Sequence, residues 1–594
     1  MSELASESMW RTTSAIGPGS LSAASPVAST APPLTERPRT DPVPPSSPPP
    51  RRSPRRPPRW PVWALLALAG ILGVFALVSV LIHPWPSDDP LFLSPHENAR
   101  WELAERWVET GRPTYELPAY DRLPDDIAPA LTPRDAGLLD GEVVPKDFPY
   151  AVALVALLQV MAPEVALLLT LASALALLVV VALFARELTG SPVAAVVATA
   201  LVATSAAFYA GSVGRIETGA VTAALVVAGL LALCRARRHR EAPTGLLLAA
   251  GACFGLSVGF HHGSAVLVGG LIAAFALLSP KPLRTAVLLG AAAAAALLPL
   301  AAFNTWLFGS PLRTGYSAAT AFYDSAVEEN SGGIFRFDVG ALACHVWRYW
   351  LRPEILLVLA AALLGARVLR RRSTPAGVLV LALLLGAVPY LVFMGARPLF
   401  GSGRFALNAS FLRYGLPVFV VVAVLASATT LATGERARRL ALTGAAVVAI
   451  VAAATIVTSD LGPRELADEY EYSGEQNDLV LEATPEDALI ITAKHDKFLW
   501  PERATLTAPF LVQRQDPGGE YLYDLVPSPE RLADVVTRLV GQGETVFLWD
   551  PGAWFASDPA RVPELDFRLA GAGILRAQEP VAGLSSFSSP AAPA

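Results

Sequence analysis

Long apolar runs separated by short polar links dominate the chain from residue 61 to residue 458. A helix needs about 20 apolar residues to cross the ~30 Å hydrocarbon core of a bilayer, and most of the runs approach that length. With 53% hydrophobic and only 16% charged residues, the composition excludes an ordinary soluble protein. We therefore expect an α-helical polytopic membrane protein with about eleven transmembrane helices, near residues 61–82, 164–186, 192–211, 217–234, 245–260, 263–279, 284–303, 354–370, 377–395, 414–432 and 439–458.

The charged links between the runs predict which side of the membrane each loop faces. With eleven spans, the basic links all fall on the side of the Arg-rich N-terminal residues, and basic loops stay in the cytoplasm. The apolar stretch 148–161 is too short for a span, so we expect a juxtamembrane or re-entrant helix on the outer face. The first loop (83–163) and the chain after residue 458 are then predicted to be extracytoplasmic. The basic links are residues 235–240, 281–284, 367–372 and 434–439.

Three regions differ in composition and predict three parts of the molecule. Residues 1–59 are rich in Pro, Ser and Arg and have no apolar period, which predicts a disordered cytoplasmic tail. Residues 60–458 form the transmembrane domain. Residues 459–594 contain strand-like stretches at 488–493 and 545–550 with a helical pattern between them, so we expect a small extracytoplasmic α/β domain.

Two common kinds of site are not indicated by the sequence. The chain has neither a P-loop nor a GxGxxG after a strand, which argues against a nucleotide site. Its three cysteines, Cys234, Cys253 and Cys344, have no metal-binding spacing, so neither zinc nor a disulfide framework is indicated.

Acidic residues gather near the predicted outer face rather than in the middle of the spans. A transporter or pump would be expected to bury charges near the bilayer midplane. Glu164 and Glu354 each follow a Pro at a helix start, where acids are favoured by the helix dipole, so they carry little functional weight. The remaining acids of this group are Asp88, Asp89, Glu97 and Glu217.

The first loop carries a pattern that resembles a known family. "SPHENARWELAERWVETGRPTY" (94–115) resembles the acidic motif and amphipathic helix that follow the first span in the GT-C superfamily of polytopic glycosyltransferases, with His96 and Glu97 in place of Asp-Glu. "VPKDFPYAVALVAL" (144–157) is similar to an element of the family 39 branch, which includes protein O-mannosyltransferases and aminoarabinose transferases. "GRIETGA" (214–220) offers Glu217 as the second acid. Short segments at 303–316 and 411–422 are also similar, so the resemblance covers roughly residues 61–460.

The resemblance implies transfer of a sugar from a polyprenyl-phosphate donor, which needs a base for the acceptor hydroxyl and a cation for the departing phosphate. Glu97 is the candidate base; alternatively it only supports its surface helix beside Arg100 and Arg106. Glu217 would orient the acceptor or help to hold a divalent metal ion, or it would only begin a helix.

Cations at the outer face are candidates for binding the donor phosphate. Arg413 and Lys146 lie at the ends of apolar segments, where charge-assisted hydrogen bonds to a lipid phosphate are possible. Interfacial anchoring is the alternative for both. His261 and His262, at a turn, would bind metal or phosphate or lie at the interface. His96, Asp88 and Asp89 are accessory candidates near the base.

Together these observations predict an inverting membrane glycosyltransferase with an extracytoplasmic glycan, lipid or protein as acceptor, and no nucleic acid partner. No cofactor is certain; a divalent metal ion, which two carboxylates could hold, is the one candidate. A transporter of lipid-linked sugars or a non-catalytic membrane scaffold is the alternative.

Overall fold

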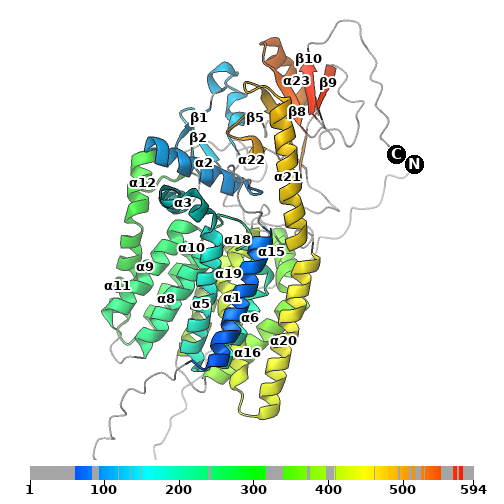
Figure 1. Cartoon of the computed structure of the whole chain (residues 1–594). Coiled ribbons are helices and arrows are strands. Elements are labelled where there is room, and N and C mark those ends of the chain that lie inside the picture. Colours follow the sequence, from blue (N-terminus) through cyan, green and yellow to red (C-terminus); the bar gives the residue numbers. More distant parts are fainter. Residues whose placement is uncertain are drawn as a thin grey trace, which may run out of the picture. The chain divides into compact units, whose positions relative to one another are not determined.

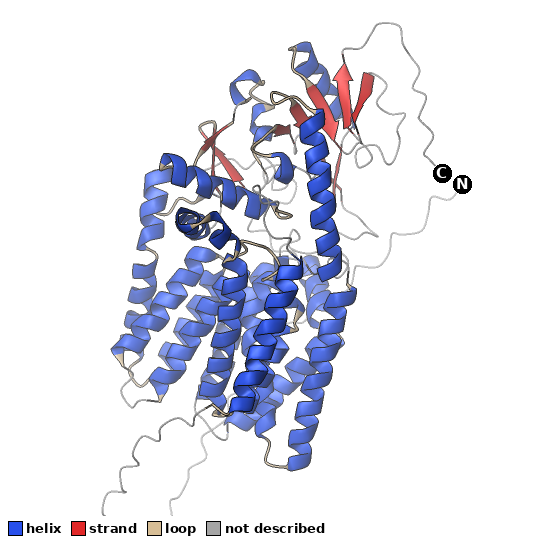
Figure 2. Ribbon diagram, viewed as in Figure 1, coloured by secondary structure: helices blue, strands red, loops and turns tan. Residues whose placement is uncertain are grey.

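The computed structural model is shown in Figures 1 and 2. It describes residues 60–82, 92–117, 119–133, 136–146, 149–238, 243–315, 339–370, 375–396, 407, 410–459, 462–492, 496–506, 511–514, 524–527, 529–549, 566–571 and 574–578. Asp88, Asp89 and the N-terminal tail, about which the sequence makes predictions, lie outside these ranges.

Six helical segments in the described residues are long and apolar enough to cross a membrane. A seventh crossing is possible if α6 (Pro192–Ala203) and the short α7 (Ala206–Ala210) are one span bent by 66°. Ser205 lies at this break and caps α7, because its hydroxyl accepts a hydrogen bond from the Phe208 amide at 3.1 Å. The six segments are α1 (Val62–Ile82), α5 (Leu169–Thr189), α8 (Gly219–Arg237), α11 (Pro282–Ala296) with α12 (Leu298–Phe308), α19 (Ser410–Ser427) with the 3₁₀ turn η6 (Ala428–Leu431), and α20 (Glu435–Thr458), which runs on toward α21 (Pro463–Ala483).

Other helices cover the remaining predicted spans. All eleven predicted runs therefore coincide with helices, while the number that crosses the bilayer stays a prediction. These helices are α9 (Thr244–Phe260), α10 (Ser264–Leu277), α16 (Pro353–Arg370), and α17 (Pro375–Ala382), which continues through the π-helical turn η4 (Leu383–Ala387) into α18 (Val388–Gly395). Before α16 come α15 (Val339–His345) and the π-helical turn η3 (Val346–Trp350).

Helix α19 is the central element of the apolar domain. It packs against α6, α7, α8 and α16, and its apolar residues are almost all buried. The approach of α16 is close at Gly365, where an added Cβ would lie 1.8 Å from the carbonyl oxygen of Leu425. Only glycine permits this distance, and close backbone contact through small residues is how membrane helices gain packing energy.

The first loop folds into a compact layer of short elements. Its long helix α2 (Pro95–Thr110) ends at Gly111, whose φ of 78° is the left-handed conformation that favours glycine. The apolar stretch 148–161 forms helix α3 (Pro149–Met161), followed by α4 (Pro163–Leu167). A three-stranded antiparallel sheet of order β1-β3-β2 lies between α2 and α3 in sequence, with the 3₁₀ turns η1 (Tyr120–Arg122) and η2 (Ala128–Leu131). Its strands are β1 (Tyr115–Glu116), β2 (Ala136–Leu139) and β3 (Glu142–Pro145).

The C-terminal residues form a mixed sheet of order β5-β4-β8-β10-β9. Strand β4 is parallel to β5 and β8, and β10 is antiparallel to β8 and β9. Both stretches predicted as strands contain one: β4 and β8. The elements are β4 (Leu489–Ile491), α22 (Asp496–Leu499), β5 (Ala504–Leu506), the hairpin strands β6 (Leu511–Arg514) and β7 (Asp524–Pro527), α23 (Pro529–Gly541), β8 (Val546–Trp549), β9 (Asp566–Gly571) and β10 (Ile574–Gln578).

The first loop and the C-terminal sheet share one hydrophobic core. Trp101 and Leu103 of α2 belong to the same buried cluster as Leu489 of β4 and Leu548 of β8. Residues more than 380 positions apart in sequence therefore belong to one core, and the buried face of α2 packs against C-terminal residues as well as against α3.

Candidate functional site

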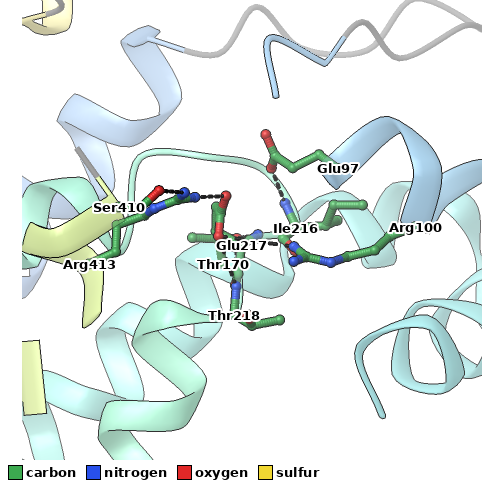
Figure 3. A network of polar contacts seen from close by, with 8 residues as sticks. All are labelled: Glu97, Arg100, Thr170, Ile216, Glu217, Thr218, Ser410 and Arg413. Carbon is green, nitrogen blue, oxygen red and sulfur yellow. Dashed lines mark hydrogen bonds and ion pairs between the residues drawn. The ribbon is translucent and has the colours of Figure 1, made fainter. Parts of the chain in front are cut away.

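Three elements bring the candidate polar residues together (Figure 3). The first turn of α2 carries Glu97, the segment between α7 and α8 carries Glu217, and the first turn of α19 carries Arg413. Pro95 at the start of α2 fixes where that helix begins, since proline fits the first helical turn and has no amide to leave unpaired. Glu97 therefore lies within the first turn of α2.

Glu217 accepts hydrogen bonds and ion pairs from several donors. Its Oε1 lies 2.5 Å from Nη1 of Arg413, and its Oε2 lies 4.0 Å from Nη1 of Arg100. Arg413 is oriented in turn by Nη2, which donates to the hydroxyl of Ser410 at 2.8 Å. The backbone is also held, because the Glu217 amide donates to the hydroxyl of Thr170 at 2.6 Å. Glu217 is thus an anion fixed between two guanidinium groups.

Glu97 has a different environment. Only 2% of it is exposed, and its Oε1 accepts a hydrogen bond from the Ile216 amide at 2.7 Å. The approach depends on Gly214, where an added Cβ would lie 2.5 Å from Oε1 of Glu97. Arg100, one turn further along α2, donates to the carbonyl of Ile216 at 3.2 Å. Both side chains of α2 therefore hold the segment that carries Glu217.

These environments shift the two carboxyl pKa values in opposite directions. Burial, and next the charge of Glu217, raise the pKa of Glu97 to about 7, against the opposing effects of the Ile216 amide and Arg100. Burial would also raise the pKa of Glu217, but Arg413, Arg100 and His96 outweigh it and hold that pKa below its usual value. At neutral pH, Glu217 is an anion and Glu97 can both accept and release a proton.

A small pocket opens beside Glu217 and Arg413. The ring of His261 lies against that of Tyr414, with centroids 4.4 Å apart, and Tyr390 forms part of the same wall. Thr222 is buried here, and its hydroxyl has no hydrogen-bond partner among the described residues. Cations on one side with aromatic and hydroxyl groups on the other suit a ligand that is part anion and part polyol. The lining residues are His96, Arg100, Glu217, Thr218, Gly219, Thr222, His261, Tyr390, Arg413, Tyr414 and Pro417.

Apolar space lies next to this polar pocket. A cavity between α8, α10 and α19 shares Pro417 with it and is lined only by apolar side chains such as Leu230, Leu271 and Val421. A larger, mainly apolar groove lies between α6, α16, α19 and α20, with Arg367 near one end. The protein thus offers lipid-compatible surfaces next to α19.

The structure brings together some of the sequence-predicted residues and separates others. Glu217, Arg413, His96 and His261 line one pocket, and Glu97 lies next to them across the backbone of Ile216. Two predicted residues, Lys146 and His262, are not among the lining residues; Lys146 is buried directly after β3, where its backbone lies close to Gly315.

Several residues of the site have no role predicted from the sequence. The sequence indicates Arg100 only as a neighbour of Glu97, although its position three residues along the same helix places it on the same face. Ser410, three residues before Arg413, follows the same rule. Thr170, Tyr390 and Thr222 meet the site through tertiary packing, for which the sequence gives no local signal.

The described part of the chain offers no three-ligand site for the predicted metal ion. No group of three or more His, Cys, Asp or Glu side chains there is arranged to hold an ion. Glu97 and Glu217 are the carboxylate ligands that the described site offers, but Glu217 already faces two guanidinium groups.

Known structures resemble the whole arrangement of helices. The chain is similar to ArnT from Cupriavidus metallidurans, solved with undecaprenyl phosphate, with a TM-score of 0.52 and 12% identity over 89% of this chain and 99% of that one. It is also similar to the Archaeoglobus fulgidus oligosaccharyltransferase, solved with zinc and sulfate, with a TM-score of 0.50 and 14% identity over 85% and 72%. No protein-family model and no curated protein matches the chain.

Proposed function

Since the chain has the fold of the GT-C glycosyltransferases, we propose that it is a multi-pass membrane glycosyltransferase that takes a sugar from a polyprenyl-phosphate donor. The observation that carries the proposal is the geometry of two buried carboxyl groups: Glu217 is paired with Arg413 and lies near Arg100, and Glu97 accepts a hydrogen bond from the Ile216 amide. These surroundings shift the two pKa values in opposite directions. Two carboxyls tuned apart in this way are typical of acid–base chemistry.

The proposed reaction is a single displacement. The acceptor hydroxyl oxygen forms a bond to the anomeric carbon, and the bond from that carbon to the phosphate oxygen breaks, with inversion. Glu97 takes the hydroxyl proton, and polyprenyl phosphate leaves with the electron pair. The two guanidinium groups stabilise the negative charge that grows on the phosphate.

The geometry suggests separate approaches for the two substrates. The donor phosphate enters the pocket lined by Arg413 and Arg100, where it competes with Glu217 for Arg413. The acceptor approaches Glu97 from the first loop, because Glu97 does not line that pocket. The substrates meet over the segment 214–217, which the side chains of Glu97 and Arg100 hold in place.

The apolar surfaces support a lipid donor. An isoprenoid chain gains about 0.8 kcal/mol for each buried CH₂ group, so the apolar cavity that shares Pro417 with the polar pocket favours a tail there. The same cavity argues against the transporter alternative, because a route through the membrane would need polar groups along it. The acceptor is a glycan, lipid or protein outside the cytoplasm.

We further propose the topology that accompanies this reaction. Eleven spans place the N-terminus in the cytoplasm, and α2, α3 and the C-terminal sheet outside it. The helices that coincide with all eleven apolar runs support this count.

The experiment is a donor-consumption assay. Purified protein in liposomes is given undecaprenyl-phosphate sugars with radiolabelled sugar, together with a membrane extract as the source of acceptors. We expect label to move from the donor to a product, with release of undecaprenyl phosphate. Absence of both binding and consumption for hexose and pentose donors alike would contradict the proposal.

A further inference from the structure

The first turn of α2 is attached to the C-terminal residues on both sides of Glu97. Asn98, the next residue, donates from Nδ2 to the carbonyl of Trp500 at 3.0 Å, and this contact is buried. Leu93, four residues before Glu97, accepts a hydrogen bond at its carbonyl from Nζ of Lys497 at 2.5 Å. Both partners come from the short stretch formed by α22 and Trp500.

Apolar packing reinforces these two hydrogen bonds. The indole of Trp500 meets the ring of Tyr115 edge-on, with centroids 5.4 Å apart, and Tyr115 lies just beyond α2. Leu93 packs against the buried cluster that contains Phe498 and Leu499. The α2 turn that carries Glu97 cannot move away without opening this packed layer.

A second C-terminal element, α21, lies close to Glu97. Tyr470 of α21 is buried, and its ring lies 5.4 Å from the guanidinium carbon of Arg215. Among the described residues, the titratable groups that act on Glu97 are Glu217, Arg100 and Tyr470, which come from three different segments of the chain, and the Arg215 backbone amide also contacts it. With Tyr470 in place, C-terminal residues contribute to the exclusion of water from Glu97.

We propose that α22 and Trp500 position the first turn of α2, with Lys497 and Trp500 as positioning residues for Glu97. The inference rests on the proposed function in one respect, that Glu97 is the base. The C-terminal sheet is then part of the catalytic unit rather than a separate binding module. Loss of the Lys497 contact lets the α2 turn fray, displaces the carboxyl and admits water to it.

The test compares Lys497→Met, which keeps the aliphatic stem and loses the donor, with Lys497→Arg, which keeps a donor. For Lys497→Met we expect kcat to fall about 10- to 100-fold, as misplacement of a catalytic group does, with less than about a twofold change in donor KM because Arg413 is untouched. The acid limb of the pH–rate profile should move to lower pH, since a better hydrated carboxyl ionises more readily. Lys497→Arg should keep kcat and the position of the acid limb close to their wild-type values.

Arg538→Met is the matched control, because it breaks another contact between the C-terminal residues and the first loop. Arg538 binds both carboxylate oxygens of Asp126, at 2.8 and 2.7 Å, but the pair is partly exposed and joins α23 to the turn before η2 rather than to α2. We expect near wild-type kcat and an unmoved acid limb. If Lys497→Met resembles Arg538→Met, or loses activity equally at every pH, the positioning role is wrong.

Two further measurements keep the inference testable. Asn98→Ala removes the other hydrogen bond from the α2 side, and it should shift the acid limb in the same direction if Lys497→Met cannot be purified folded. Hydrogen–deuterium exchange of residues 95–100 should accelerate in both variants, and unchanged protection would overturn the inference. If Glu97→Gln keeps its turnover while this exchange accelerates, the base assignment fails and the positioning of α2 stands.

Discussion

At the scale of single residues, the site shows how one type of side chain takes two roles. Glu217 is held between Arg413 and Arg100, so it stays ionised and keeps both guanidinium groups oriented. Glu97 meets one backbone amide in a buried setting, so its charge is costly. The difference comes from the residues that surround each side chain, since both are glutamates near helix starts.

The base assignment predicts the effect of Glu97→Gln. Glutamine keeps the shape and can still accept the Ile216 amide hydrogen bond, but it cannot take the acceptor's proton. Turnover should fall about 10²–10⁴-fold, the usual contribution of a general base, while donor affinity stays within about twofold. The assay is sugar transfer in liposomes. Glu105→Gln, on the exposed side of α2, is the control, and equal, mild effects of the two variants would refute the assignment.

The raised pKa of Glu97 predicts two pH effects. Activity needs the ionised form, so kcat should rise as pH increases through about 7. Stability has the opposite sign: between the unfolded value of about 4.5 and the folded value of about 7 the native state binds the extra proton, so stability falls as pH rises through this window. Glu97→Gln should therefore have the lowered turnover given above yet melt at a higher temperature than wild type at pH 8, measured by thermal unfolding in detergent. A lower melting temperature would contradict this account.

Arg413 is predicted to act on the donor. Arg413→Ala should raise donor KM at least about tenfold, because a charge-assisted phosphate contact is worth roughly 1.5–3 kcal/mol. Arg413→Lys should recover part of the loss, since a fork of donors becomes a point charge. Binding of labelled undecaprenyl phosphate measures the effect directly. Arg352→Ala serves as the control, because Arg352 pairs with Glu354 at the start of α16, outside the polar pocket, and equal losses in both variants would count against a phosphate role.

At the scale of elements, the sequence predicts where most helices lie but not how they pack against one another. Apolar length alone locates α1, α5, α8 and α19, because a helix in the membrane is specified by its own residues. The break between α6 and α7 escaped prediction, since Thr204 and Ser205 are too few to interrupt an apolar run. The contact of Asn98 with Trp500 joins residues 402 positions apart and has no local signal.

Close helix packing gives a prediction at this scale. Gly365→Leu should prevent α16 from meeting α19, because the added Cβ would overlap the Leu425 carbonyl. The expected result is a large drop in monodisperse protein after solubilisation, seen by fluorescence-detected size exclusion. Gly444→Leu in α20 is the matched control, since an added Cβ at Gly444 meets no atom within 4 Å and should be tolerated. Equal yields of the two variants would argue against a tight α16–α19 contact.

At the scale of the whole molecule, the candidate site contains residues from regions that differ in composition. The sequence distinguishes an apolar domain from an α/β region, and the five-stranded mixed sheet of the structure lies in the second of these regions. It does not reveal that Trp101 and Leu548 belong to one core, because burial between distant segments depends on the assembled fold. Glu97, from the first loop, and Tyr470, from α21, meet only in that assembly.

Membrane topology is the prediction that belongs to this scale. The outer-face site requires that α2, the start of α19 and the C-terminal residues lie on one side, opposite the basic links at 235–240 and 367–372. Alkaline phosphatase, active only outside the cytoplasm, should be active when fused after residue 594 and inactive after residue 239 or 371; green fluorescent protein should give the reverse pattern. The contact between Lys497 and Leu93 makes the outcome decisive, because the first loop and the C-terminal residues cannot lie on opposite sides of a membrane while it exists. An inactive phosphatase at residue 594 with normal expression would therefore overturn the eleven-span count and the extracytoplasmic placement of the site together.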